Sequence, residues 1–451
     1  MSTIKAGFAR VDITPPLGTP LVGYFSKRPA SGILDPLYTT AVAVNDGENT
    51  AVIISNDLIG IDNEHSDHIR AEIAKKYNLN FDLIFLTCTH THLAQAMSTK
   101  YGENFLPEIF DMTEKKIVGA VKIAIDDMKE AEMYVASGEA PVKASFVRTF
   151  KMKDGTVATN PGRLNPAVDY PIGLADQRVA LTCFKREGAP EIAIINFQTH
   201  SDSIGGTKIS ADYAHFIRTT YEAVFPNSCC MYMCGAQGNT ITACIDRTDD
   251  MMMMQKKGNY GFSTAFVGRV VAGTAISLYG NAKKVDAFPI RAAFVDAELV
   301  YNKPESEEKI EELRKIKKLH EEDRLSEIEI PQGHTSMTRV SILAEATKRL
   351  GLIDLPDTVN IRITGLRIGD LNFIGFPGEP FTEIGLRVKE ARKGKMTYIA
   401  CCANGYEGYY PSTAAMLAGG LGYEYKSARY KIGTEDRLVE AATKVLDELY
   451  K

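Results

Sequence analysis

Two histidines close one apolar run of the sequence. His90 and His92 stand near the end of the stretch IFLTCTHTHLAQA, residues 84–96. Side chains two residues apart in a strand point to the same face, so a strand that continued through Thr91 would aim both imidazoles at one ligand. Imidazole is a common metal ligand and also titrates near neutral pH. The spacing therefore indicates a metal or catalytic site, although two structural histidines that bond nearby backbone would give the same pattern.

Three later strand-like runs also lead into residues that bind metals or carry protons. AIINFQTHSDS contains His200, LNFIGFPGEPF carries Glu379 behind its apolar run, and YIACCANGYEGYYPS leads into several tyrosines. Because open α/β sheets bind ligands at their strand ends, we expect these residues to share one crevice. Two imidazoles and one carboxylate are a usual ligand set of catalytic zinc. For Glu379 alone, a place in the first turn of a helix would also explain an acid.

The composition is that of an ordinary globular protein, with 45% hydrophobic and 24% charged residues among 451. A net charge of −5 gives no electrostatic footprint for nucleic acid, and no run is long and apolar enough for a membrane helix. The N-terminal stretch MSTIKAGFARVDITPP lacks the apolar core of a signal peptide, and the eight cysteines are scattered as reduced thiols are. We expect a cytoplasmic protein with a small-molecule partner, without nucleic-acid partners or an integral membrane segment. Assembly into a homo-oligomer stays open.

The order of elements predicts an α/β fold of mixed β-sheets flanked by helices, in a single domain over residues 1–451. RVALTCF, EIAIINFQTH and SCCMYMCG are typical of buried strands, and AVAVND and TAVIISNDLIG predict a hairpin. Helices are expected in SDHIRAEIAKKYN and PEIFDMTEKKIVGAVKIAIDDM, and over 211–225, 261–279 and 435–450. Residues 303–335 are charge-dense and helix-prone, which predicts an inserted helical hairpin on the surface. A lid or an oligomer contact is the alternative for this segment.

A series of segments resembles the catalytic domain of the neutral/alkaline ceramidase family. The segments are GFARVDITPPLGTPLVGY, DPLYTTAVAVNDG, VIISNDLIGI, THTH, INFQTH with ISADY, FPGEPFTEIGLR, and NGYEGYYP with GYE. They follow the family order and extend from about Gly7 to Gly433, apart from the charged segment. The resemblance implies the mixed α/β fold of that catalytic domain and a zinc-dependent hydrolase that cleaves an amide bond.

The resemblance also implies roles for individual residues. Matched by position, the Zn²⁺ ligands are His90, His200, Glu379 and Tyr409. Tyr406 and Tyr410 are alternative positions for the tyrosine ligand. The second histidine of THTH, His92, would contact the substrate near the reacting carbonyl. Tyr423 corresponds to a second pocket tyrosine, and Arg148 in SFVRTFKMKDG to an arginine that contacts the substrate.

The chain departs from the family at the nucleophile. The family carries its catalytic serine in a G-D-x-S-P-N loop, whereas this chain reads GNTITA, with Asn239 for the aspartate and Ile241 at the serine position. Thr240 and Thr242 are out of register, and branching at Cβ restricts their reach. We also expect no C-terminal immunoglobulin-like domain and no secretion signal. These departures argue against ceramide and for a small soluble substrate.

The sequence therefore predicts a zinc-dependent hydrolase in which metal-activated water cleaves a C–N bond, with ester, lactam and glycosidic bonds left open. His92 and Tyr423 would bond the developing oxyanion, and Arg148 would hold an anionic or polar group. Asp57 and Asp212 are candidates to orient the histidine ligands, with a helix cap as the alternative for Asp212. Two alternatives remain for the function: a metal-binding homologue without catalysis, and a ceramidase that uses one of the two threonines.

Overall fold

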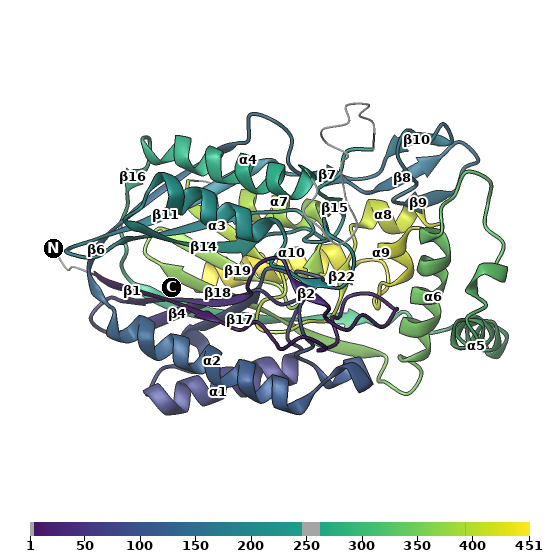
Figure 1. Ribbon diagram of the computed structural model, residues 1–451, viewed down its shortest axis with the longest axis horizontal. Coiled ribbons are helices and arrows are strands. Elements are labelled where there is room, and N and C mark those ends of the chain that lie inside the picture. Colours follow the sequence, from purple (N-terminus) through teal and green to yellow (C-terminus); the bar gives the residue numbers. More distant parts are fainter. Residues whose placement is uncertain (1–3, 246–261, 393) are drawn as a thin grey trace.

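A mixed nine-stranded sheet forms the largest layer of the protein (Figure 1). The structure is a computed structural model that describes residues 4–245, 262–392 and 394–451. The strands lie in the order β14-β12-β11-β6-β1-β3-β4-β5, and β16 pairs with β6. The pairs β12–β14 and β4–β5 are parallel, whereas β3 and β4 form the predicted antiparallel hairpin. The strands are β1 (Ile4–Asp12), β3 (Tyr38–Asn45), β4 (Thr50–Asn56), β5 (Ile84–Cys88), β6 (Lys129–Glu139), β11 (Arg178–Arg186), β12 (Glu191–Phe197), β14 (Ser228–Cys234) and β16 (Lys283–Lys284).

A second sheet packs face to face against the first. It has the order β17-β18-β19-β21, and its strands are β17 (Ile290–Val300), β18 (Thr358–Ile368), β19 (Leu371–Gly375) and β21 (Met396–Ala400). One apolar cluster joins the two sheets and includes Phe85 and Phe184 from the first and Phe373 and Tyr398 from the second. The rings of Phe85 and Phe373 lie 6.0 Å apart. The two sheets therefore share a buried core, as two-layer packing requires.

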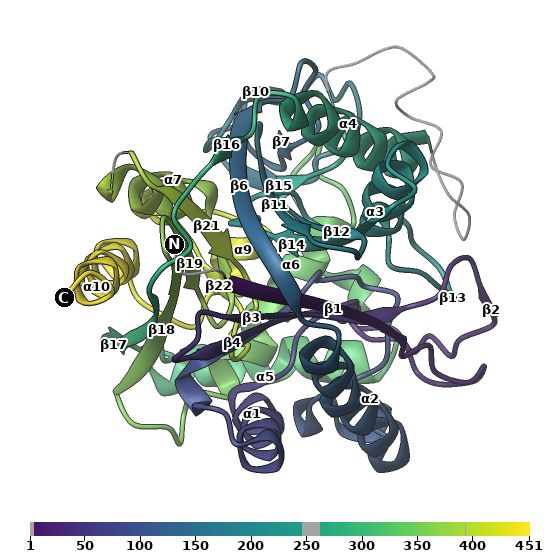
Figure 2. The ribbon, with the colours of Figure 1, turned by 90° about the vertical axis from the view of Figure 1, so that its left-hand side faces the viewer.

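Helices cover the outer faces of both sheets, so the fold has four layers (Figure 2). The large sheet is covered by α1 (Asn63–Tyr77), α2 (Pro107–Asp126), α3 (Tyr213–Val224) and α4 (Phe262–Tyr279). The small sheet is covered by α7 (Thr382–Ala391) and α10 (Thr434–Glu448). The predicted helices over 211–225, 261–279 and 435–450 correspond to α3, α4 and α10. The predicted fold class is thus confirmed.

Several further helices lie at the end of the molecule opposite the N-terminus (Figure 1). The helices there are α5 (Glu307–Glu321), α6 (Met337–Leu350), α8 (Thr413–Ala418) and α9 (Tyr423–Lys426). Short strands complete the fold: β2 (Gly32–Ile33), β7 (Phe146–Val147), β8 (Thr149–Met152), β9 (Val157–Thr159), β10 (Val168–Pro171), β13 (Lys208–Ile209), β15 (Thr240–Ile241), β20 (Glu379–Pro380) and β22 (Tyr409–Tyr410). In the described residues the 3₁₀ turns are η1 (Phe81–Leu83), η2 (Thr99–Asn104) and η4 (Leu325–Glu327). Within the described ranges, no helix has the length and apolar character that crossing a membrane requires.

A buried ion pair fixes α3 to the end of β4. Both carboxylate oxygens of Asp57 accept from Arg218, at 2.9 and 2.7 Å, and both residues are almost wholly buried. Asp57 also accepts from the backbone N–H of Tyr38 at 2.9 Å and from the Thr89 hydroxyl at 3.1 Å. The sequence-based role of Asp57 as a group that orients a histidine is therefore wrong, because its acceptor positions serve this network instead.

Asp212 acts as the N-cap of α3, in line with the capping alternative. Its side chain accepts from the backbone N–H of Tyr213 at 2.6 Å and of Ser203 at 2.9 Å. Such capping satisfies N–H groups that a helix start leaves without partners. Since Ser203 follows His200 closely, Asp212 also fixes the chain just beyond that histidine.

Replacing Asp57 by Asn should destabilise the fold strongly, because Arg218 would remain buried without a counter-charge. We expect the free energy of unfolding to fall by about 3–5 kcal/mol, measured by urea denaturation. The control is Lys122→Ala, which breaks an exposed pair with Asp126 at 2.6 Å and should cost less than about 1 kcal/mol. Equal effects of the two substitutions would contradict the structural role given to the buried pair.

Candidate active site

His90 and His92 lie on the loop after β5, not within a strand. The strand ends at Cys88, so the condition under which strand alternation would aim both imidazoles at one ligand is not met. His90 has a φ of +67°, a left-handed conformation that is uncommon for residues other than glycine. Its backbone N–H donates to the Leu58 carbonyl at 2.9 Å. The loop, rather than strand alternation, brings the two rings to a centroid distance of 5.1 Å.

His200, on the loop after β12, completes a compact group of three histidines. Its ring centroid lies 4.7 Å from that of His90 and 5.1 Å from that of His92. The Nε2 atoms of His92 and His200 are 3.1 Å apart, and one ring nitrogen from each histidine lies within 4.8 Å of the other two. All three side chains are buried. This cluster could hold a metal ion.

The ring nitrogens have the hydrogen-bonding state that a metal ligand needs. His90 Nδ1 lies 2.6 Å from the Ile59 carbonyl, which fixes a proton there and makes Nε2 the nitrogen that can coordinate a metal. Within the described part of the chain, His90 Nε2, His92 Nδ1 and His200 Nδ1 have no hydrogen-bond partner. Burial, together with neighbouring positive charge, lowers the pKa values of His92 and His200 well below the ordinary value. Both rings are therefore neutral at physiological pH and able to coordinate.

Glu379 lies against this cluster with its side chain fully buried. Its Oε2 is 3.2 Å from His90 Nε2 and 3.6 Å from His200 Nδ1. The Tyr406 hydroxyl donates to Oε1 at 2.7 Å, and Gln237 Nε2 donates to Oε2 at 3.2 Å. Burial disfavours the ionised carboxylate, but the neighbouring His90 and the hydrogen bond from Tyr406 hold the Glu379 pKa below its usual value. Conversely, although burial opposes protonation, Glu379 raises the pKa of His90.

Two short parallel strands position Glu379 beside the tyrosines. Glu379 pairs with Tyr409 in the β20–β22 ladder. Gly378 permits this approach, because a Cβ at that residue would lie 2.4 Å from the carbonyl oxygen of Gly408. Tyr409 stacks on His200 at a ring distance of 6.4 Å, whereas Tyr410 turns away and is wholly buried. Of the three candidate tyrosines, Tyr406 and Tyr409 thus lie at the site.

Arg148 also reaches the site, but its charge is already balanced. Its Nε lies 2.5 Å from Glu424 Oε1, and both side chains are buried. Its Nη2 donates to the Gly238 carbonyl at 2.9 Å and to the Tyr409 hydroxyl at 3.1 Å. Although burial opposes the charge, the facing Glu424 carboxylate raises the Arg148 pKa. Arg148 therefore orients Tyr409, and its pairing with Glu424 weakens the expected role as an anion-binding group.

A cavity of about 410 Å³ opens in front of these residues. The polar side is formed by His92, Arg148, His200, Tyr409 and Tyr423. The lining also includes Phe25, His320, Leu325, Met337, Val340 and Leu343. The predicted charged segment thus supplies His320 from α5 and Leu325 from η4 to the cavity wall. If residues 303–335 act as a lid, some of their side chains should line the cavity, as these two do. That the segment is an insertion stays a prediction.

The two threonines near the expected serine position do not line this cavity. The Thr240 hydroxyl donates to the Gln237 carbonyl at 3.0 Å. Both threonines are wholly buried, and Ile241 pairs with β7 in a short antiparallel ladder. The loop therefore offers the cavity no hydroxyl that could serve as a nucleophile.

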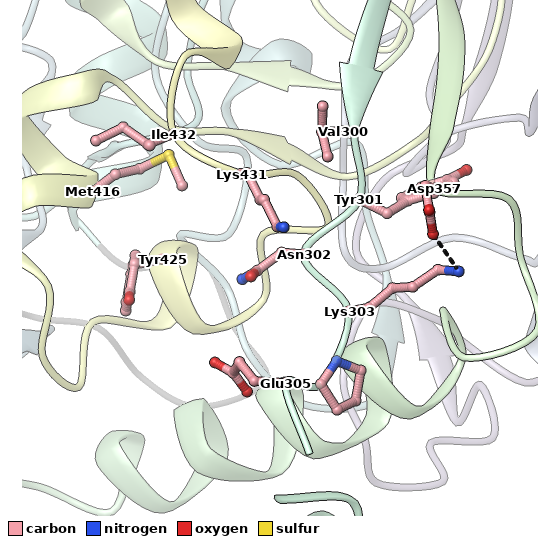
Figure 3. Close-up of a pocket in the computed structure, with 11 residues that line it drawn as sticks. Val300, Tyr301, Asn302, Lys303, Glu305, Asp357, Met416, Tyr425, Lys431 and Ile432 are labelled. Carbon is pink, nitrogen blue, oxygen red and sulfur yellow. Dashed lines mark ion pairs between the residues drawn. The ribbon is translucent and has the colours of Figure 1, made fainter. Parts of the chain in front are cut away.

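Another cavity, of about 700 Å³, lies between the end of β17 and the chain around Lys431 (Figure 3). An ion pair between Lys303 and Asp357, at 3.0 Å, closes one side of it. Its lining contains no histidine or cysteine. Although this cavity is larger, no cluster of buried histidines lines it, so the histidine-lined cavity is the candidate active site.

Several site residues were not predicted from the sequence. Gln237 and the partner of Arg148, Glu424, hold the site's charges in place, and Tyr24 and Asp202 line the cavity. Asp202 stands two residues after His200, which was its only signal in the sequence. Burial raises its pKa to about 6, against a lowering contribution from its hydrogen bond with Tyr24.

Replacing Glu424 by Gln should leave Arg148 buried without its counter-charge. We expect the free energy of unfolding to fall by about 3–5 kcal/mol, measured by urea denaturation. Adding Arg148→Met should recover part of this loss, because the double variant buries neither charge. If the single and double variants unfold alike, the two side chains are not energetically coupled.

No family model and no curated protein matches the sequence. Solved structures of ceramidases are among those similar in fold. The crystal structure of neutral ceramidase from Pseudomonas aeruginosa has a TM-score of 0.73 and 18% identity, over 100% of this chain and 75% of that one. A ceramidase complexed with C2 has a TM-score of 0.72 and 17% identity, over 100% and 76% of the two chains. The predicted resemblance to neutral ceramidases is thereby confirmed at the level of the fold.

Proposed function

We propose that the protein is a zinc-dependent hydrolase that cleaves an amide bond of a small soluble substrate. The observation that carries this proposal is the group of three buried histidines beside Glu379, at the inner end of a cavity of about 410 Å³. Pockets of this size suit small molecules. The resemblance to ceramidases favours an amide among the bonds that such a site could hydrolyse.

The depth of the side chains supports a division between metal ligands and substrate contacts. His90 and Glu379 do not line the cavity, whereas His92 does and is 8% exposed. His200 contacts both groups. We therefore take His90, His200 and Glu379 as ligands and leave His92 for the substrate. Tyr409 lines the cavity and is also 8% exposed, so its place as the fourth ligand rests on the resemblance to ceramidases. Two imidazoles with oxygen donors form a set that Zn²⁺ accepts.

When bound there, Zn²⁺ would polarise a carbonyl and lower the pKa of a water molecule to about 7. Side chains of the protein would stabilise the oxyanion and position the metal ligands. His92 and Tyr423 face the cavity, where each can donate a hydrogen bond to a developing oxyanion. Burial raises the Tyr423 pKa, so its hydroxyl keeps its proton. Arg148 would hold Tyr409 in place, and water would be the nucleophile because neither nearby threonine lines the cavity.

Metal content should separate the roles of the histidines. Protein purified without chelator should contain about one equivalent of zinc by elemental analysis. His90→Ala should lose the metal, because it removes a ligand at the inner end of the site. His92→Ala should keep the metal and lose about 10²–10³-fold in turnover. If His92→Ala also loses the metal, His92 belongs among the ligands.

Activity should depend on Glu379 and not on the threonines. In a screen of small amides, esters, lactams and glycosides, Thr240→Ala and Thr242→Ala should keep most of the wild-type rate. Glu379→Gln should lose nearly all of it, because an anionic ligand is removed. Loss of activity in a threonine variant with metal intact would contradict attack by water. A zinc-loaded wild type that turns over no compound would instead favour a metal-binding protein without catalysis.

A further inference from the structure

Asp202 presents a carboxylate to the cavity, separate from Glu379. It lines the cavity two residues beyond His200, and one of its oxygens accepts a hydrogen bond from the Tyr24 hydroxyl. Over the ranges that the structure describes, no lysine, arginine or histidine forms an ion pair with it. A carboxylate has room for several donors, so one hydrogen bond leaves it able to accept more.

The arginine side chains near Asp202 are bound to other groups. Arg148 is paired with Glu424 at 2.5 Å. Arg28 does not line the cavity: its guanidinium donates to three backbone carbonyls and stacks over the Tyr24 ring at 3.9 Å. Arg28 therefore holds Tyr24, which in turn holds Asp202. The charge that the cavity offers to a ligand on this side is the negative charge of Asp202.

Apolar side chains supply the complementary part of the binding site. The lining of the cavity includes Phe25, Leu325, Met337, Val340 and Leu343, with His320 as the one imidazole among the lining residues of α5, η4 and α6. A cavity of about 410 Å³ admits a short apolar chain together with one polar head. An ammonium head suits Asp202 best, because hydrogen bonds between two charged groups are roughly twice as strong as neutral ones. A carboxylate head would be repelled.

We infer that the substrate carries a protonated amine, which Asp202 binds while the scissile carbonyl lies at His92. The identity of the scissile bond rests on the proposed function. The ammonium site itself rests on Asp202 and its surroundings. In this arrangement Asp202 determines specificity, and Tyr24 and Arg28 position it.

The test of the ammonium site uses ligands that cannot be hydrolysed. Hexylamine and hexanol have the same chain and differ in the charge of the head. Titration calorimetry on the zinc-loaded protein at pH 7 should show hexylamine binding at least about tenfold tighter than hexanol. Asp202→Asn should remove this preference, and Asp202→Glu, which keeps the charge, should retain part of it. The control Glu103→Gln removes an exposed acid that pairs with Lys27 outside the cavity, and should leave the preference unchanged.

Three results would overturn the inference. The first is a preference for hexylamine below about twofold in the wild type, which decides the matter even if Asp202→Asn does not fold. The second is an unchanged preference in folded Asp202→Asn, as direct binding of the amine to the metal would give. The third is an equal loss in Asp202→Glu and Asp202→Asn.

A turnover measurement separates this inference from the proposed function. N-butanoyl-1,3-diaminopropane and N-butanoyl-3-amino-1-propanol differ only in an amine against a hydroxyl. The wild type should hydrolyse the amine compound with a kcat/KM at least about tenfold higher. Hydrolysis of both at equal rates would overturn the ammonium site and leave the amide hydrolase standing. Hydrolysis of neither, with the hexylamine preference intact, would overturn the hydrolase and leave the ammonium site standing.

Discussion

The fully buried carboxylate of Glu379 is the constraint on which the site depends. Without access to solvent, it must be surrounded by hydrogen-bond donors or positive charge. An isolated charge in a protein interior is costly unless it is paired and hydrogen-bonded. The groups around Glu379 come from separate parts of the chain. The hydrogen-bond donors are Gln237 after β14 and Tyr406 before β22, and the imidazoles of His90 after β5 and His200 after β12 lie beside the carboxylate. The ends of both sheets must therefore meet at one point, and the packing of the sheets brings this about.

Polar contacts across the sheet interface bring these strand ends together. The Thr87 hydroxyl of β5 donates to the carbonyl of Cys401, just beyond β21, at 2.8 Å. The Asn196 amide of β12 donates to the Ile399 carbonyl at 3.0 Å, and the Asn404 side chain accepts from the Leu86 N–H at 2.8 Å. These contacts lie directly behind the histidine loops. The apolar core fixes the distance between the sheets, and these hydrogen bonds fix how the strand ends line up.

Much of this arrangement could be predicted from local sequence, because apolar periodicity and strand-end residues are local signals. The strands, the main helices and the gathering of His90, His92, His200 and Glu379 follow from such patterns. The sequence left open whether the strand continues through Thr91. In the structure β5 ends at Cys88, and the backbone N–H groups of Thr89 and His90 donate to the carbonyls of Asn56 and Leu58. Such contacts are set by tertiary packing, which overrides the local pattern.

Contacts between charged residues that are far apart in the sequence could not be predicted either. Asp57 was expected to orient a histidine, yet Arg218 of α3 occupies it. In the sequence Glu424 stands out only as the neighbour of Tyr423, whereas in the structure it forms an ion pair with Arg148. A sequence shows that a charge exists, but not which opposite charge will meet it once both are buried. The single-domain organisation and the insertion over 303–335 stay predictions for a related reason, since both concern how the chain is divided rather than what it contacts.

The loop at the expected serine position has a structural use that accounts for its composition. Asn239 accepts from the backbone N–H of Thr382 at 2.9 Å, at the start of α7, and donates to the Leu174 carbonyl at 3.1 Å. The carbonyl of Gly238 accepts from Arg148, and the Thr240 hydroxyl bonds within the loop. The loop is thus hydrogen-bonded to the start of α7, to the backbone at Leu174 and to Arg148, which orients Tyr409. A serine that faced the cavity would require a different loop conformation and would disturb these bonds. In this chain the loop supports the site from behind, and the chemistry falls to the histidines, Glu379 and the residues that face the cavity.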